Sequence, residues 1–156
     1  MAELTVLGIG NVLMRDDGVG VHLLEAVRAA RRWGENVEFI DGGVGGLRLL
    51  TVLESAKRLV VFDVADMQLP PGEFRLLGPG QLREDGQGQW SLHEISFAET
   101  LRLCGQFCTV PGEVAIMAIQ PADVTHGRQL SPTLAGEFDK LVDAAVKLVE
   151  GQLHRP

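Results

Sequence analysis

Apolar runs and segments with helical periodicity alternate along most of this chain. Short apolar runs bounded by Gly, Pro or Asp predict strands, and apolar residues spaced three or four apart predict amphipathic helices. Strands are expected at residues 4–9, 36–40, 58–62, 73–77 and 113–119. Helices are expected at residues 19–30 and 47–56, from Ser91 through Cys104, and from Ser131-Pro132 through Leu148, with a frayed tail after Gly151.

This alternation predicts a largely parallel sheet with helices on both faces, because parallel strands need crossover connections. The centre of the 58–62 run is continuously apolar, as is typical of a central strand covered on both sides. The 73–77 segment lies in a stretch rich in Pro, Gly and Gln and is expected to be an edge strand that can run antiparallel. We therefore predict a three-layer αβα sandwich with a five-stranded sheet. Ligands should bind at the carboxyl ends of the strands, where the strand order reverses.

Composition narrows the class of protein. With 156 residues, of which 46% are hydrophobic, the chain suits one domain spanning residues 1–156. The formal charge of -7 and the lack of a Lys/Arg cluster disfavour nucleic acid or an anionic membrane as a partner. No signal peptide and no membrane-spanning segment is recognisable, and the two cysteines, Cys104 and Cys108, are expected to be reduced. These features predict a cytoplasmic protein, which we expect to be a monomer.

The Gly8-Ile9-Gly10-Asn11 turn after the first strand invites comparison with a dinucleotide-binding loop. The third glycine of that motif is missing, since position 13 is Leu. The loop continues into Asp16 and Asp17, whose negative charges would repel a phosphate. Dinucleotide binding is therefore disfavoured.

Carboxylates stand at the ends of two predicted strands. Asp16 and Asp17 come just before a helix, where one of them can simply cap its free N–H groups. Asp63 ends the buried central strand, so its carboxylate should either face a cleft or be paired at considerable cost. The Asp41-Gly42-Gly43 turn ends another strand and can either contact a substrate or serve only as a tight turn.

His93 is expected in the first turn of the helix that begins at Ser91, and its position alone is weak evidence for a site. His22, Glu25 and His126 are rival metal ligands, but they lie in a helical pattern or a polar loop. Together, Asp17, Asp63 and His93 would make a partly open set of nitrogen and oxygen ligands suited to nickel or zinc. A metal with vacant positions can polarise a carbonyl group.

Several blocks of sequence resemble the hydrogenase maturation protease family in content, order and spacing. The blocks are Leu7-Gly8-Ile9-Gly10-Asn11-Val12-Leu13-Met14-Arg15-Asp16-Asp17-Gly18-Val19-Gly20, Asp41-Gly42-Gly43 with Gly46 and Leu47, Leu59-Val60-Val61-Phe62-Asp63, Ser91-Leu92-His93, and Leu130-Ser131-Pro132-Thr133. The resemblance covers nearly the whole chain. It implies a phosphorylase/hydrolase-like αβα fold.

The resemblance also implies an activity. Members of the family are endopeptidases that remove a short C-terminal extension from the precursor of a nickel-iron hydrogenase large subunit after nickel has been inserted. It makes Asp17, Asp63 and His93 the metal-binding and catalytic residues, with Asp17 where some members have Glu. The nickel would be supplied by the precursor, no organic cofactor would be needed, and Asp41, Gly42 and Gly43 would contact the substrate. The alternatives are a peptidase of the same fold acting on another peptide, such as a germination-type protease, and a non-catalytic nickel- or nucleotide-binding accessory protein.

Overall fold

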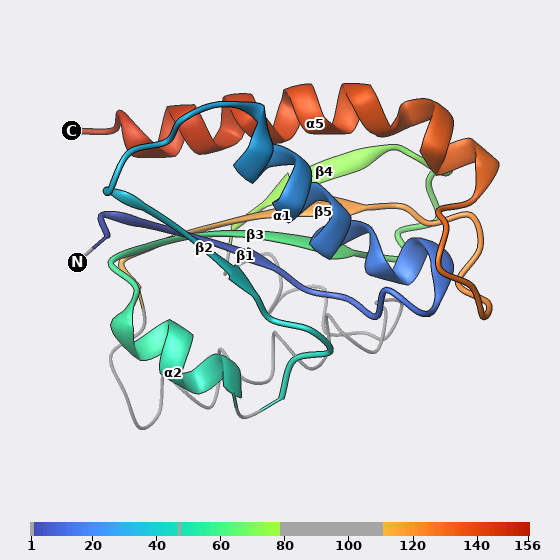
Figure 1. Cartoon of the computed structure of the whole chain (residues 1–156), viewed down its shortest axis with the longest axis horizontal. Coiled ribbons are helices and arrows are strands. Elements are labelled where there is room, and N and C mark those ends of the chain that lie inside the picture. Colours follow the sequence, from blue (N-terminus) through green and yellow to red (C-terminus); the bar gives the residue numbers. More distant parts are fainter. Residues whose placement is uncertain (1, 47, 79–110) are drawn as a thin grey trace.

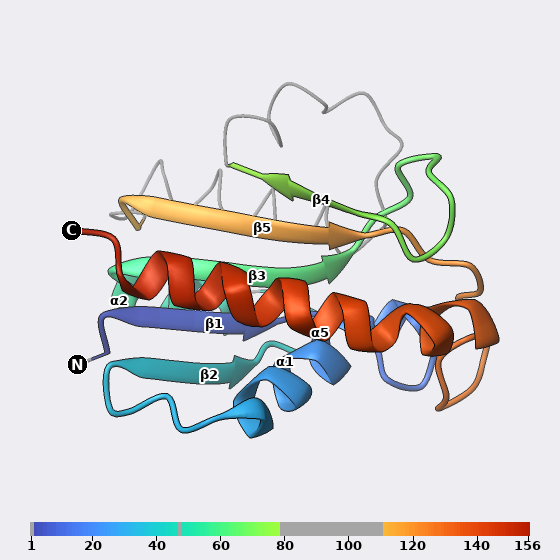
Figure 2. The same ribbon diagram turned by 90° about the horizontal axis from the view of Figure 1, so that it is seen from above.

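Five strands form one sheet in the order β2-β1-β3-β5-β4. The computed structural model describes residues 2–46, 48–78 and 111–156. The strands are β1 (Leu4–Gly8), β2 (Val37–Asp41), β3 (Arg58–Val64), β4 (Phe74–Leu77) and β5 (Glu113–Ile119); the helices are α1 (Val19–Ala30), α2 (Arg48–Ser55) and α5 (Pro132–Leu153), with a short 3-10 helix η1 (Arg15–Gly18) before α1. β1 pairs in parallel with β2 and β3, β3 pairs in parallel with β5, and β4 runs antiparallel to β5 (Figure 2). The predicted fold class is confirmed.

Helices cover both faces of the sheet: α1 and α5 lie on one side and α2 on the other (Figure 1). Alternate residues of β3 pack into the two resulting cores. Val60 and Phe62 belong to the cluster beneath α1 and α5, whereas Leu59 and Val61 belong to the cluster beneath α2. Because side chains alternate along a strand, Asp63 points to the α2 face of the sheet.

Most predicted bounds agree with the structure. α1 and β5 begin and end at the predicted residues. β1 and α2 end one residue early, β4 begins one residue late, and β2 is shifted by one residue at both ends. The predicted end of β3 at Phe62 is wrong. Asp63 and Val64 continue the strand because they pair with Ala118 and Ile119 of β5. Asp63 therefore belongs to the second-to-last residue pair between β3 and β5 and does not lie in the loop beyond the strand.

The predicted fraying after Gly151 is also wrong, since α5 extends through Leu153. Two contacts explain the extra length. Val149 is fully buried against the sheet, and Nη1 of Arg58 donates to the carbonyl of Gln152 at 3.0 Å. The last turn of α5 is therefore tied to the beginning of β3.

Part of the predicted architecture lies outside the described residues. This applies to the helix that begins at Ser91, to His93 and to the two cysteines, Cys104 and Cys108. Over the ranges that the structure describes, no helix combines the length and apolar character needed to cross a membrane.

Replacing Gly136 with alanine is expected to stabilise the protein by about 0.5–1 kcal/mol, because glycine inside a helix loses more backbone entropy on folding. Gly136 lies in α5, and an added Cβ would meet no heavy atom within 4 Å. Urea unfolding followed by circular dichroism measures the change. Gly34→Ala is the control: it has the same open space but a φ of +78°, so alanine there should destabilise. Equal effects at both positions would contradict the prediction.

Candidate active site

The strand order reverses at β1, which creates a switch point at the carboxyl ends of β1 and β3. After β1 the chain passes through α1 and returns as β2 on one side of β1, and then crosses over to form β3 on the other side. The two ends are joined directly, since the N–H of Ile9 donates to the carbonyl of Phe62 at 2.9 Å. Open α/β sheets bind their ligands at such a point. Two of the predicted site residues, Asp17 and Asp63, belong to these two strand ends.

Asp63 is buried, with only 1% of its surface exposed. Its Oδ1 accepts a hydrogen bond from the N–H of Val64 at 2.8 Å. Burial raises the pKa of Asp63 well above its ordinary value, the Val64 hydrogen bond lowers this pKa, and the negative charge of Asp17 raises it further. The Asp17 effect means that the two carboxylates are close enough to influence one another. Burial, more than the charge of Asp17, makes the ionised form of Asp63 unfavourable.

Asp17 lies in η1 and is partly buried. Its Oδ2 accepts a hydrogen bond from the N–H of Asn11 at 3.2 Å, across the loop that follows β1. The backbone N–H of Asp17 donates to the carbonyl of Met14 at 3.1 Å, which closes the turn. Asp17 is thus held at its backbone and at one carboxylate oxygen, on the loop that faces the end of β3.

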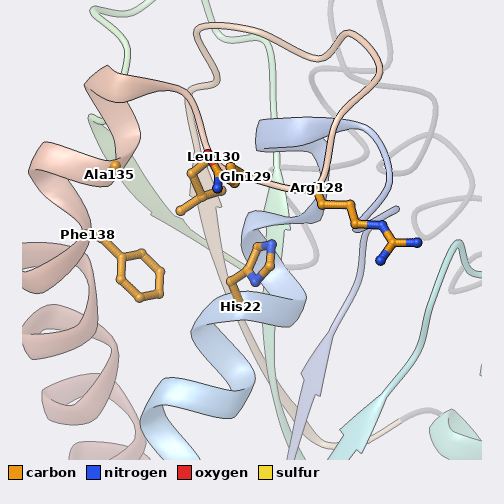
Figure 3. Close-up of a pocket in the computed structure, with 6 residues that line it drawn as sticks. All are labelled: His22, Arg128, Gln129, Leu130, Ala135 and Phe138. Atoms are coloured by element: carbon orange, nitrogen blue, oxygen red, sulfur yellow. The ribbon is translucent and has the colours of Figure 1, made fainter.

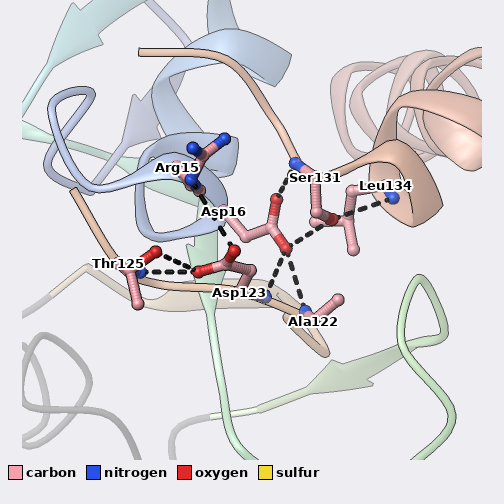
Figure 4. Close-up of polar contacts among 7 residues, drawn as sticks. All are labelled: Arg15, Asp16, Ala122, Asp123, Thr125, Ser131 and Leu134. Atoms are coloured by element: carbon pink, nitrogen blue, oxygen red, sulfur yellow. Dashed lines mark hydrogen bonds and ion pairs between the residues drawn. The ribbon is translucent and has the colours of Figure 1, made fainter. Parts of the chain in front are cut away.

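Asp16 does not have the capping role that the sequence suggested for one of the two aspartates. The N-cap of α1 is Gly18, and neither α1 nor η1 has a side-chain cap. The Asp16 carboxylate is instead fully buried and accepts hydrogen bonds from Ala122, Asp123 and Ser131 (Figure 4). The interpretation as a helix cap is wrong for Asp16, because its partners come from a distant segment of the chain.

The Asp41-Gly42-Gly43 turn is closed by its own hydrogen bonds. Oδ1 of Asp41 accepts from the N–H of Gly43 at 2.8 Å, and the N–H of Gly42 donates to the carbonyl of Gly8 at 2.8 Å. The carbonyl of Gly43 accepts from the N–H of Gly10 at 2.7 Å. The turn therefore supports the loop after β1. A contact of Asp41, Gly42 or Gly43 with substrate stays a prediction.

The rival ligands make other contacts. Glu25 forms an ion pair with Arg28 at 3.3 Å, and Nδ1 of His126 lies 3.3 Å from Sδ of Met14. Within the described ranges, no three His, Cys, Asp or Glu residues gather to hold a metal ion. Since His93 lies outside those ranges, the set formed by Asp17, Asp63 and His93 stays a prediction. Asp63, which is buried, and Asp17, which is partly buried, are nevertheless oxygen donors of the kind that fits a divalent cation.

His22 points into a separate pocket of about 430 Å³ between α1 and the start of α5 (Figure 3). The pocket is lined by His22, Arg128, Gln129, Leu130, Ala135 and Phe138. Burial lowers the pKa of His22, and among the described residues its Nε2 has no hydrogen-bond partner. The lining of the pocket is mainly apolar, and none of the lining residues is an Asp or Glu that could join His22 in binding a metal. The pocket therefore does not make His22 a metal ligand.

The fold and the carboxylate pair define a doubly wound α/β protein with an acidic site at its switch point. The chain belongs to the hydrogenase maturation protease family, whose model matches residues 21–148. It is 33% identical over 149 residues to the hydrogenase expression/formation protein HupD of Bradyrhizobium diazoefficiens, a match that covers 94% of this chain and 78% of that protein. Family membership supports an endopeptidase role.

Solved structures agree with this assignment. The hydrogenase maturating endopeptidase HybD from Escherichia coli superposes with a TM-score of 0.84 over 97% of this chain and 93% of that one; at 23% identity, this likeness shows the fold. A second endopeptidase from Escherichia coli is 26% identical and superposes with a TM-score of 0.77, over 98% of this chain and 92% of that one. The resemblance inferred from sequence blocks is confirmed at the level of the family.

Proposed function

We propose that this protein is an endopeptidase that removes the C-terminal extension of a nickel-iron hydrogenase large-subunit precursor after nickel insertion. The observation that carries the proposal is the buried carboxylate of Asp63 beside Asp17, at the switch point of a chain that belongs to this family. A buried carboxylate with a second carboxylate nearby is costly unless a proton or a cation compensates its charge. A site of this kind suits a cation that arrives with the substrate.

In this proposal, nickel already held by the precursor is the recognition element. Asp17 and Asp63 contact the metal from the switch point, and His93 supplies the third ligand. Metal binding competes with protonation of Asp63, because a carboxylate must be deprotonated to ligate a metal. Precursor without nickel lacks the cation that would neutralise the pair and is left uncut. A second role for nickel stays open within the proposal, because a metal ion that contacts the scissile carbonyl would polarise it.

The test compares nickel-loaded and nickel-free precursor incubated with the purified protein, and follows the size shift by mass spectrometry. We expect cleavage of the nickel-loaded form alone. Asp17→Asn, Asp63→Asn and His93→Ala should each lower the rate by at least about 100-fold, the loss typical of removing one group that stabilises a reacting carbonyl. Glu25→Gln, which changes an exposed acid on α1, is the control and should cleave normally.

The outcomes separate the alternatives. Normal cleavage by all three site variants would make the site assignment wrong. Equal cleavage of nickel-free precursor would exclude nickel as the recognition element. Binding of nickel-loaded precursor with no cleavage by the wild-type protein would favour a non-catalytic accessory protein.

A further inference from the structure

We propose that Asp16 is the positioning residue of the candidate active site, and that the two adjacent aspartates have separate tasks. Asp16 fastens the loop after β1, and Asp17 acts on the substrate. The second part rests on the proposed function. The first part rests on the contacts of Asp16 alone.

The carboxylate of Asp16 is saturated with hydrogen bonds. Its Oδ2 accepts from the N–H of Ala122 and of Asp123, each at 2.9 Å, and from Oγ of Ser131 at 2.7 Å. Its Oδ1 accepts from the N–H of Ser131 at 2.7 Å (Figure 4). A carboxylate offers about four lone-pair positions, so little capacity is left for a substrate or a metal. Asp16 is also fully buried, so its hydrogen bonds to these N–H and O–H groups do not compete with water.

The backbone around Asp16 is bound to the same distant segment. The N–H of Asp16 donates to the carbonyl of Asp123 at 3.0 Å, and the N–H of Arg15 donates to the carbonyl of Gly127 at 2.8 Å. The N–H of Gly127 donates in turn to the carbonyl of Leu13 at 2.8 Å. Arg15 has a φ of +46°, which is unfavourable for a non-glycine residue and persists only where the surroundings impose it. The loop is therefore held in one conformation by its contacts with residues 122–131.

Asp17 follows Asp16 directly in η1, where each residue turns by about 120° relative to the last because the helix has three residues per turn. When the Asp16 carboxylate is held on one side of η1, the Asp17 side chain has to project from a different side of the same helix. Asp17 accepts a hydrogen bond from the N–H of Asn11 and affects the pKa of Asp63. The hydrogen bonds of the Asp16 carboxylate go instead to residues 122, 123 and 131. A displacement of about 1 Å at a catalytic group can cost about 100-fold in rate, so this anchoring bears directly on activity.

Ser131 extends the anchor to α5. Its Oγ donates to Asp16 and also accepts from the N–H of Leu134 at 3.3 Å, as the N-cap of that helix. The Asp16 carboxylate thus connects the loop after β1 to the N-terminus of α5. Removing the Ser131 hydroxyl should loosen this junction less than changing Asp16, because it removes one of the four hydrogen bonds.

The test uses Asp16→Asn in the full chain. The amide keeps the size of the side chain but turns one acceptor into a donor, which faces N–H groups. With nickel-loaded precursor, we expect kcat to fall by about 100-fold while KM stays near the wild-type value. Ser131→Ala should give a smaller fall in kcat. Val149→Ala, a core change in α5 away from the loop, should keep kcat when assayed well below its melting temperature.

Hydrogen exchange of the Asn11 amide gives a readout that does not depend on cleavage. This N–H donates to Asp17, so its protection reports where Asp17 lies. We expect faster exchange in Asp16→Asn and Ser131→Ala but not in Val149→Ala. Wild-type kcat and wild-type Asn11 protection in Asp16→Asn and in Ser131→Ala would overturn the proposal, as would an equal loss of kcat in Val149→Ala. If the wild-type protein does not cleave, the proposed function fails, and Asn11 exchange still decides whether Asp16 positions the loop.

Discussion

Replacing Asp63 with asparagine is expected to abolish precursor cleavage and, in metal-free protein at neutral pH, to raise the free energy of unfolding. Burial holds the pKa of Asp63 well above its ordinary value of 3.8, so the ionised form is unfavourable in the folded protein. Asparagine has nearly the same shape, carries no charge, and can still accept the Val64 hydrogen bond through its oxygen. The variant should therefore lose function and gain stability.

The sign of the pH dependence follows from linkage. Because the folded-state pKa of Asp63 is raised, the folded protein binds more protons than the unfolded chain. The contribution of Asp63 to stability is complete below the unfolded pKa and is lost as the pH rises through the folded pKa. Each unit by which burial raises that pKa corresponds to about 1.4 kcal/mol. The advantage of Asp63→Asn should start near pH 4, grow with pH, and level off above the folded pKa.

Urea unfolding in EDTA between pH 4 and pH 8 measures this difference. The lowered pKa of His22 adds an opposite dependence, but His22 is present in both proteins and cancels in the difference. Asp139→Asn, at an exposed position of α5, is the control and should show no growing advantage. A lower stability of Asp63→Asn at pH 7 in EDTA would mean that a partner within the folded protein compensates the Asp63 charge.

The layers and strand directions of the fold could be predicted because they depend on local periodicity. The apolar run at the centre of β3 and the helical spacing in α1 are both visible without any knowledge of partners. The end of β3 could not be predicted in this way. Asp63 is polar and suggests a strand end, but its place in the sheet is set by pairing with Ala118, which lies in β5, far along the chain.

The site was only partly predictable for the same reason. Asp63 stands out because it follows a buried apolar run. Asp16 and Asp17 are identical neighbours, and what distinguishes them is the set of N–H groups contributed by residues 106 to 115 positions away. Local sequence therefore suggested a helix cap, while tertiary contacts made Asp16 an anchor. The Ser131-Pro132 helix start was recognisable, but nothing near it in sequence indicates that Ser131 also donates to Asp16.

Gly10→Ala is expected to damage stability and activity together, through the same loop. A Cβ at Gly10 would lie 2.1 Å from the backbone oxygen of Asp17 and 3.0 Å from Cα of Gly18, so the backbone of η1 must move. Gly10 also has a φ of +152°, a conformation that alanine adopts only with strain. Overpacking and backbone strain together should lower the free energy of unfolding by at least about 3 kcal/mol. The displacement of Asp17 should lower kcat by about 100-fold or more.

Urea unfolding and single-turnover cleavage of nickel-loaded precursor measure the two losses in Gly10→Ala. Gly34→Ala is the matched control, since Gly34 precedes β2 at the amino end of the sheet, has a φ of +78°, and leaves open space around an added Cβ. It carries backbone strain without a collision, so it should lose stability and keep kcat. If Gly10→Ala kept its kcat at a temperature where it is folded, the loop after β1 would tolerate displacement, and Asp17 would not depend on the position that Gly10 and Asp16 impose. If instead both variants lost kcat equally, the loss would follow global stability and not the geometry of the site.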